Sequence, residues 1–251
     1  LNEMRYIQTK YPDNTNLSDM ILGGAFHFND LDHHDSGDIS YRTMSWLGAD
    51  QPVETKSAEF SPINYGIVMY QKTGLLFFYL KDYLGEELFD QCAMEYYRNW
   101  EFKHPSPADM RASFEQTSGK DLGWLFDDLI NTTHHVDYKI VRAKQTPKGL
   151  NVKVKNVGQV NGPIEVNLVK NGKVVATQWA EPAEKSSDVV FSGSQEFDQI
   201  VIDYTKDIPD INRFNNSMKA KGILKKVEPP KFEWLMGDNE SDRTNIFWSP
   251  I

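Results

Sequence analysis

The spacing of apolar residues divides the chain into a helical half and a strand-rich half. Between residues 62 and 131, apolar residues recur three and four positions apart, as is typical of helices. This spacing predicts helices over about 62–84, 88–100, 107–118 and 122–131. After His135 apolar and polar residues alternate, which predicts about six or seven short antiparallel strands. We therefore expect an α+β protein with more than one domain.

Residues that favour helix ends set the limits of the expected helices. Ser61, followed by proline, is a candidate N-cap, and Gly85 is placed to end the same helix. Ser106 repeats the serine–proline start, and Asp109 is placed to complete a capping box. Gly119 should end this helix.

The second half carries the turn signals of a small all-β unit. Asn171-Gly172 predicts a tight hairpin that joins strands at 165–170 and 173–178. Short strands at this density suggest an Ig-like β-sandwich. Beyond Asp207 the chain is charged and irregular, so we expect a linker there. Residues 11–59 also lack periodicity and contain turn residues, which predicts a long loop.

Composition and charge exclude several classes of protein. Hydrophobic residues make up 39% of the 251-residue chain, enough for a packed core and too many for wholesale disorder. No apolar run reaches the roughly 18 residues needed to span a bilayer. The net charge is −11 over residues 1–134 and +2 over residues 135–251, which suggests two units with different surfaces. No basic stripe with interleaved aromatic residues is present, so we expect no nucleic-acid partner.

Motifs that would by themselves reveal an enzyme are absent from the sequence. None of the six histidines is followed by glutamate, so the H-E-x-x-H zinc motif is missing. A single cysteine, Cys92, excludes an intrachain disulfide and a cysteine-rich zinc site. Two runs, Asp32-His33-His34-Asp35 and His134-His135, could bind a metal weakly. We favour the simpler interpretation, in which the first run is a solvated loop and the second is a pair at a domain junction.

Two tyrosines on the helix predicted over 62–84 are candidates for chemistry. Tyr65 and Tyr70 lie in an otherwise apolar helix, where a buried phenol needs a hydrogen-bond partner. Tyr70 is followed by the polar run Gln71-Lys72-Thr73, and polar groups in a buried helix often face a cleft. The alternative is that both phenols bond to neighbouring backbone.

Both ends of the chain suggest a piece of a longer protein. The chain starts at Leu1 without a start methionine, and the spacing of Leu1, Met4 and Ile7 predicts a helix already under way. The other end, from Asn245 to Ile251, is an apolar, strand-like run that stops abruptly, whereas free termini are usually polar. We expect upstream and downstream segments of the same protein to be missing. A natural mature terminus is the alternative.

Several short segments between Tyr65 and Asn131 occur in a characteristic order. They are Tyr65-Gly66-Ile67-Val68-Met69-Tyr70-Gln71-Lys72-Thr73-Gly74, Leu80-x-x-Tyr83-Leu84-Gly85-Glu86-Glu87-x-Phe89, Trp100-Glu101-Phe102-Lys103-His104-Pro105, Asp109, Phe114 and Ser118-Gly119-Lys120-Asp121-Leu122-Gly123-Trp124-Leu125-Phe126. Together they resemble the zinc aminopeptidases (gluzincins) that include aminopeptidase N and the leukotriene-hydrolase enzymes. The first segment resembles the family's Y-x-K-G stretch. The β segment, which ends in Asp210-Ile211-Asn212-Arg213-Phe214-Asn215-Asn216, is similar to the small domain after the catalytic domain in bacterial relatives.

The resemblance implies a fold and a mechanism. In this family a thermolysin-like domain holds zinc, and metal-activated water attacks the peptide carbonyl. Tyr70, by its place in Y-x-K-G, would donate a hydrogen bond to the developing oxyanion. Tyr65 matches a second active-site tyrosine found in some members. On a straight helix five residues turn about 140°, so the two phenols would diverge unless Tyr65 sits at a distorted helix start.

The chain departs from the family in its metal ligands. The family's H-E-x-x-H and G-x-M-E-N segments precede the matched region, and the downstream zinc ligand should fall near Leu1. Glu3 is either that ligand or, since Met4 replaces the expected glycine, an ordinary helical carboxylate. We therefore expect zinc and the peptide substrate to bind the full-length parent. This chain alone should hold no catalytic zinc and cleave no peptide.

The expected organisation follows from these points. Residues 1–134 would be the helical C-terminal lobe of a thermolysin-like catalytic domain, 135–206 a small antiparallel β-sandwich, and 207–251 an extension towards a missing element. The parent would be a zinc aminopeptidase in an extracytoplasmic bacterial setting. The alternatives are a non-catalytic aminopeptidase-like scaffold and a cell-surface adhesion module built on the sandwich.

Overall fold

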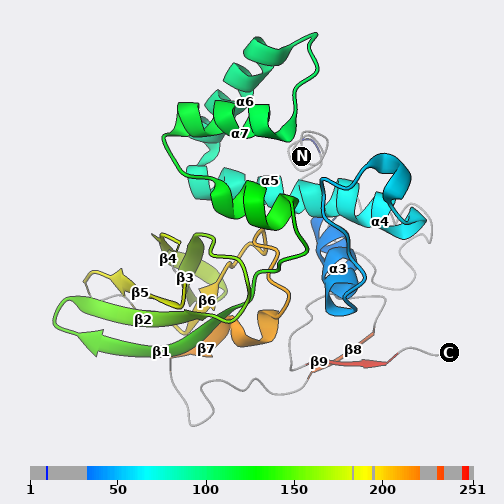
Figure 1. The fold of residues 1–251 in the computed structure, drawn as a ribbon. Helices are drawn as coiled ribbons and strands as arrows, with labels where there is room; N and C mark the ends of the chain where they lie inside the picture. The colour runs from blue at the N-terminus through cyan, green and yellow to red at the C-terminus, as the bar shows by residue number, and fades with distance from the viewer. Residues whose placement is uncertain are drawn as a thin grey trace.

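A computed structural model describes Lys10 and residues 33–182, 184–193 and 196–220, with side chains from Gly37 in the first of these ranges, and the backbone of 231–234 and 245–248. Within these residues the chain has an α+β fold, with the helices grouped on one side of two antiparallel sheets (Figure 1). The helical elements are α3 (His33–Trp46), the 3-10 turn η2 (Ser57–Glu59), α4 (Pro62–Gly66), the π-helix η3 (Ile67–Lys72), α5 (Thr73–Leu84), α6 (Glu86–Trp100), α7 (Pro107–Ser118), the π-helix η4 (Trp124–Ile130) and the 3-10 turn η5 (Arg213–Asn215).

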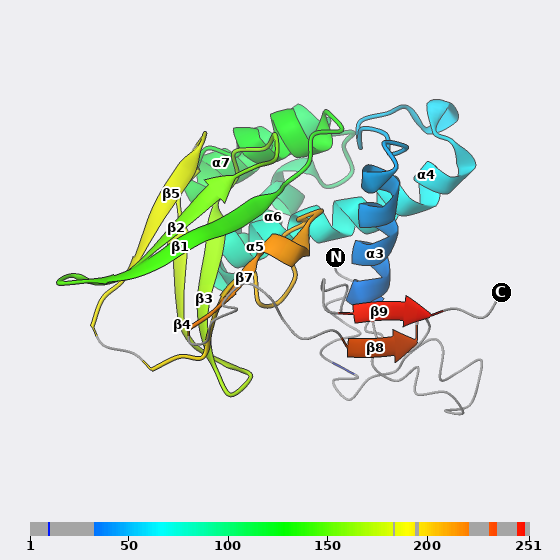
Figure 2. The same ribbon diagram turned by 90° about the horizontal axis from the view of Figure 1, so that it is seen from below.

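The strands pair mainly with neighbours along the chain. They are β1 (Tyr138–Thr146), β2 (Gly149–Asn156), β3 (Ile164–Lys170), β4 (Lys173–Ala180), β5 (Ser186–Phe191), β6 (Gln199–Ile202), β7 (Ser217–Lys219), β8 (Lys231–Trp234) and β9 (Asn245–Trp248). One antiparallel sheet has the order β1-β2-β5 and the other β4-β3-β6-β7, while β8 and β9 form a parallel pair (Figure 2). The predicted hairpin at Asn171-Gly172 is confirmed, because both residues have positive φ and join β3 to β4.

The predicted helix ends are confirmed by the caps. The Ser61 side chain accepts a hydrogen bond from the Asn64 amide, and Gly85 (φ 80°) follows the last residue of α5. Ser106 and Asp109 form the expected reciprocal capping box at the start of α7, and Gly119 ends that helix in the left-handed conformation. From Pro62 to Leu84 the chain is helical throughout, as predicted, but it passes through the π-helix η3.

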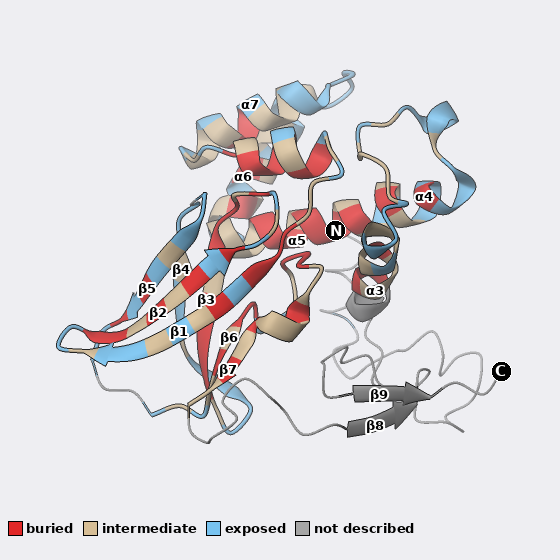
Figure 3. Cartoon of the chain, turned by 60° about the horizontal axis from the view of Figure 1, so that its bottom comes forward, coloured by how far each residue is buried: buried red, intermediate tan, exposed pale blue. Residues whose placement is uncertain are grey.

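One hydrophobic core runs through both halves of the molecule. Its buried residues extend from Leu76 in α5 to Met218 in β7 and include residues of both sheets (Figure 3). Tyr79 of α5 lies at the junction: its hydroxyl donates to the Pro163 carbonyl just before β3, and its ring lies 4.6 Å from that of Trp124 in η4. Helices and sheets are therefore packed as one unit.

Two parts of the chain differ from the sequence prediction. The loop expected over 11–59 is wrong for residues 33–46, which form α3, while 11–32 lie outside the described residues. The irregular chain expected beyond Asp207 is wrong for 213–219, which form η5 and β7. In both places buried polar contacts replace the apolar periodicity that sequence reasoning looks for. Asp210, for example, is fully buried and accepts from the Tyr138 amide at 2.9 Å.

A buried charge cluster joins these two segments. Arg213, which is 8% exposed, donates to Asp203 Oδ2 at 2.8 Å and to Asp38 Oδ1 in α3 at 3.2 Å. Arg42, one turn further along α3, also donates to Asp38 at 3.2 Å. The start of α3 is thus tied to the chain after β6.

Among the described helices none combines the length and apolar character needed to cross a bilayer.

Candidate functional site

The two candidate tyrosines lie side by side at the surface. Tyr65 is in α4 and Tyr70 in η3, and their ring centroids are 5.9 Å apart in an edge-to-face arrangement. Tyr65 is 41% exposed and Tyr70 is 62% exposed. The Phe60 ring lies 6.3 Å from that of Tyr65 and extends the aromatic row. A hydrogen bond with the Tyr65 hydroxyl raises the pKa of Tyr70 above the ordinary tyrosine value, at which a phenol is already protonated at neutral pH.

The π-helix explains how residues five apart come into contact. In an α-helix the side chains that stack are four apart, whereas in a π-helix the hydrogen bonds run between residues five apart. The Thr73 amide donates to the Val68 carbonyl across five residues, and the Thr73 hydroxyl donates to the same carbonyl at 3.1 Å. The π-helical turn therefore reduces the divergence of about 140° expected on a straight helix, and the two rings are in contact. The distorted part of the helix begins at Ile67, after Tyr65, and not at Tyr65 itself.

Asn64 fixes the first end of this segment. It is 3% exposed, and its Nδ2 donates to the Ala49 carbonyl at 2.7 Å and to Gln51 Oε1 at 3.1 Å. Gln51 Oε1 also accepts from the Ser61 amide at 2.8 Å. The chain before α4 and the start of α4 are thereby joined through two side-chain amides.

Lys72 fixes the other end. It is fully buried, with Nζ 3.8 Å from Asp50 Oδ2, 3.5 Å from the Thr132 carbonyl and 5.2 Å from the centre of the Tyr41 ring. Burial lowers the pKa of Lys72 to about 8, against the opposing effect of Asp50. The prediction that the run Gln71-Lys72-Thr73 faces a cleft is therefore wrong for Lys72. Its ammonium lies inside the protein, next to the Asp50 carboxylate and the Thr132 carbonyl.

The histidine runs do not form a metal centre in the part of the chain that the structure describes. His134 Nδ1 lies 3.3 Å from Asp128 Oδ1, and burial lowers the pKa of His135. Among the described side chains, no group of three or more His, Cys, Asp and Glu residues could hold a metal ion. Glu3 and the side chains of the run from Asp32 to Asp35 lie outside the described residues. The described residues therefore do not fit a zinc ion.

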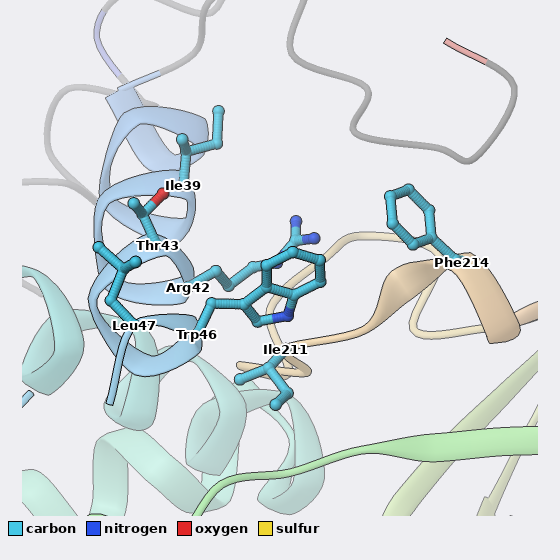
Figure 4. A pocket seen from close by; sticks show the side chains of 7 residues that line it. All are labelled: Ile39, Arg42, Thr43, Trp46, Leu47, Ile211 and Phe214. Carbon is cyan, nitrogen blue, oxygen red and sulfur yellow. The ribbon is translucent and has the colours of Figure 1, made fainter. Parts of the chain in front are cut away.

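Two hollows lie away from the tyrosines. The first, of about 240 Å³, opens between α3 and the segment around η5 (Figure 4), and is lined by Ile39, Arg42, Thr43, Trp46, Leu47, Ile211 and Phe214. The second, of about 690 Å³, lies over α6 and α7 and is lined mostly by aromatic and apolar residues. The first is lined mostly by apolar groups, and its polar groups are the Arg42 side chain, which donates to Asp38, the hydroxyl of Thr43 and the indole nitrogen of Trp46. Neither hollow includes Tyr65 or Tyr70.

Comparison with known proteins relates this fold to an aminopeptidase. No protein-family model matches the sequence, and no curated protein matches it. The structure is similar to that of Legionella pneumophila aminopeptidase A, solved in complex with aspartic acid, with a TM-score of 0.52 and 16% sequence identity. The match covers 66% of this chain and 20% of the Legionella chain. The likeness shows that the chain has an aminopeptidase-like fold, and that it spans only a small part of the length of that enzyme.

Sequence reasoning named the two tyrosines as candidates but missed the buried residues next to them. Asn64, Val68 and Lys72 are buried at intervals of four residues, while the tyrosines between them are exposed. The four-residue spacing of these three residues in the sequence could have indicated one buried helix face with a polar residue at each end. It was masked because the whole segment from Pro62 to Leu84 was interpreted as apolar nearly all round.

Proposed function

We propose that this chain is part of a zinc-dependent metallopeptidase of the aminopeptidase type. Residues 1–134 would supply the helical lobe of a thermolysin-like catalytic domain, 135–206 a β-sandwich and 207–251 an extension. Three observations support the proposal: the aminopeptidase-like fold, the Y-x-K-G resemblance, and the exposed tyrosine pair. The contact between Tyr65 and Tyr70 on an open surface carries it, because this is where the resemblance puts the oxyanion donor.

The chemistry assigned to this chain is hydrogen-bond donation. A phenol that stays protonated can donate to the oxygen of a peptide carbonyl as negative charge develops on it. Tyr70 would be this donor, and Tyr65 would hold its orientation and line the same surface. Since the described residues do not fit zinc, the metal would be bound by the full-length parent through other segments. The parent would act on peptides in an extracytoplasmic bacterial setting, and this chain alone would be inactive.

The experiment is to test Tyr70→Phe in the full-length parent with an aminoacyl reporter substrate. Loss of one oxyanion donor should lower kcat by about 100- to 1,000-fold and leave KM nearly unchanged. Tyr97→Phe is the matched control, because Tyr97 is 64% exposed in the same helical half and should change neither constant. A wild-type kcat in Tyr70→Phe would refute the role of Tyr70. A parent without zinc-dependent turnover would refute the peptidase and favour the non-catalytic scaffold.

A further inference from the structure

Two buried polar residues flank the tyrosine pair along the chain. Asn64 precedes Tyr65 directly, and Lys72 follows Tyr70 by two positions. Their exposed fractions are 3% and 0%, against 41% and 62% for the phenols between them. The segment from 64 to 72 therefore turns its polar ends inward and its two tyrosines outward.

Both inward-facing residues reach the same three-residue segment, 49–51. Asn64 Nδ2 donates to the Ala49 carbonyl and to Gln51 Oε1, at 2.7 and 3.1 Å. The Lys72 ammonium pairs with the Asp50 carboxylate, whose side chain is 4% exposed. One short segment thus holds both ends of the helical stretch that carries the tyrosines.

Stability alone does not account for these buried polar groups. Removing an amide or an ammonium from water costs free energy that its internal partners at best offset. Apolar residues of similar volume often pack as well as a buried ion pair, or better. A role in geometry is the better explanation, because the hydrogen bonds of Asn64 are directional, and the buried Lys72 ammonium must stay close to Asp50 to keep its charge paired.

The geometry that needs support is the π-helical turn. A π-helix is rare and short, and the same residues in an α-helix would turn Tyr65 and Tyr70 about 140° apart. Fixing the chain at residue 64 and again at residue 72 restricts the number of turns that can form between them. We propose that Asn64 and Lys72 are positioning residues, which hold η3 in its π-helical form by binding segment 49–51 and so keep the two phenols in contact. The catalytic value of this contact rests on the proposed function, but the contact itself can be tested without it.

The experiment compares Asn64→Ala and Lys72→Met in the 251-residue chain with labelled tyrosines. NMR cross-peaks between the rings report the contact, and the pH titration of each phenol reports the hydrogen bond; Tyr65→Phe and Tyr70→Phe assign the signals. In both variants the ring cross-peaks should be lost, and the Tyr70 titration should move down towards the ordinary tyrosine pKa of about 10. Lys72→Met keeps the length of the side chain and removes only its charge and donors.

Asn156→Ala is the matched control for lost hydrogen bonds. Asn156 is also buried, and its Nδ2 makes two hydrogen bonds, to the Val160 carbonyl at 2.9 Å and to Asn161 Oδ1 at 2.8 Å. It lies in β2, so its loss should weaken folding without changing the tyrosine signals. If Asn64→Ala fails to fold, Gln51→Ala removes one of the same contacts from the partner side and should show the same loss.

The result that overturns the proposal is a folded variant, at either end, whose tyrosine cross-peaks and titrations equal those of the wild type. Equal changes in Asn156→Ala would overturn it as well, because they would show a general loosening of the fold. Neither readout depends on turnover. An inactive parent with an intact tyrosine pair would therefore refute the peptidase and leave the positioning role standing.

Discussion

Replacing Arg213 with methionine removes the cation that joins α3 to the chain after β6. The guanidinium donates to Asp203 and Asp38, at 2.8 and 3.2 Å, and to the carbonyls of Lys206 and Ile208, at 2.8 and 2.9 Å. The two carboxylates are only 2% and 3% exposed, so water cannot replace the lost donors. Breaking a buried ion pair by removing one partner costs about 3–5 kcal/mol.

The expected loss of unfolding free energy lies at the lower end of this range, because both carboxylates keep other partners. Asp38 keeps its ion pair with Arg42, and Asp203 still accepts from the backbone amides of Asp207 and Ile208, each at 2.9 Å. We therefore expect Arg213→Met to lower the free energy of unfolding by about 3 kcal/mol. Burial opposes ionisation of Asp38, but the nearby Arg213 and Arg42 hold the pKa of this carboxyl below its ordinary value. Without Arg213 that pKa should rise, so the loss should shrink as the pH falls from about 7 to about 4.

Urea denaturation followed by tryptophan fluorescence measures this loss directly. Arg42→Met is the control: its removal leaves Asp38 paired with Arg213, so we expect a smaller loss of unfolding free energy than for Arg213→Met. A loss below about 1 kcal/mol for Arg213→Met, or equal losses for the two variants, would refute the reasoning.

Three further predictions concern single contacts. Phe114 is 1% exposed and packs against aromatic rings of α5 and α6. Phe114→Ala should therefore lower the free energy of unfolding, measured in urea, by about 3–5 kcal/mol. A loss under about 1 kcal/mol would contradict this packing. Ser106→Ala removes half of the capping box with Asp109 and should cost about 1 kcal/mol; an unchanged melting curve would show that the cap is not needed. Burial and the neighbouring Asp207 raise the pKa of Asp82 from 3.8 to about 8, so stability should fall as the pH rises from about 4 to about 8. Asp82→Asn should flatten this pH dependence of stability. An unaltered dependence in unfolding experiments would count against the raised pKa of Asp82.

The elements that the sequence predicted correctly are set by local chemistry. Ser106 and Asp109 cap α7 through contacts three residues apart, and the left-handed Gly119 ends it. Asn171-Gly172 similarly supports the hairpin between β3 and β4 without help from distant residues. Such features can be predicted from a few neighbouring residues, because the partners of each backbone group lie in the same short segment.

The elements that were missed depend on distant partners. Helix α3 contains Gly37 and several serines, which disfavour a helix interior, and its buried Asp38 is paired with Arg213 in η5. The tyrosines were named as site residues from their place in a helix, but the π-helical turn that joins them was not predicted. It is tied to segment 49–51, which was interpreted as part of a loop, and no spacing rule links Asp50 to Lys72.

The contact between Asp38 and Arg213 joins two residues that the ribosome makes at different times. The two residues are 175 positions apart, so a ribosome adding about 5–20 residues per second makes the arginine about 10–35 s after the aspartate. During this interval Asp38 can pair with Arg42, one turn further along the same helix, but not with Arg213. The contact between α3 and the chain after β6 can form only once Arg213 has been made, and until then the Asp38 carboxylate lacks its second cation.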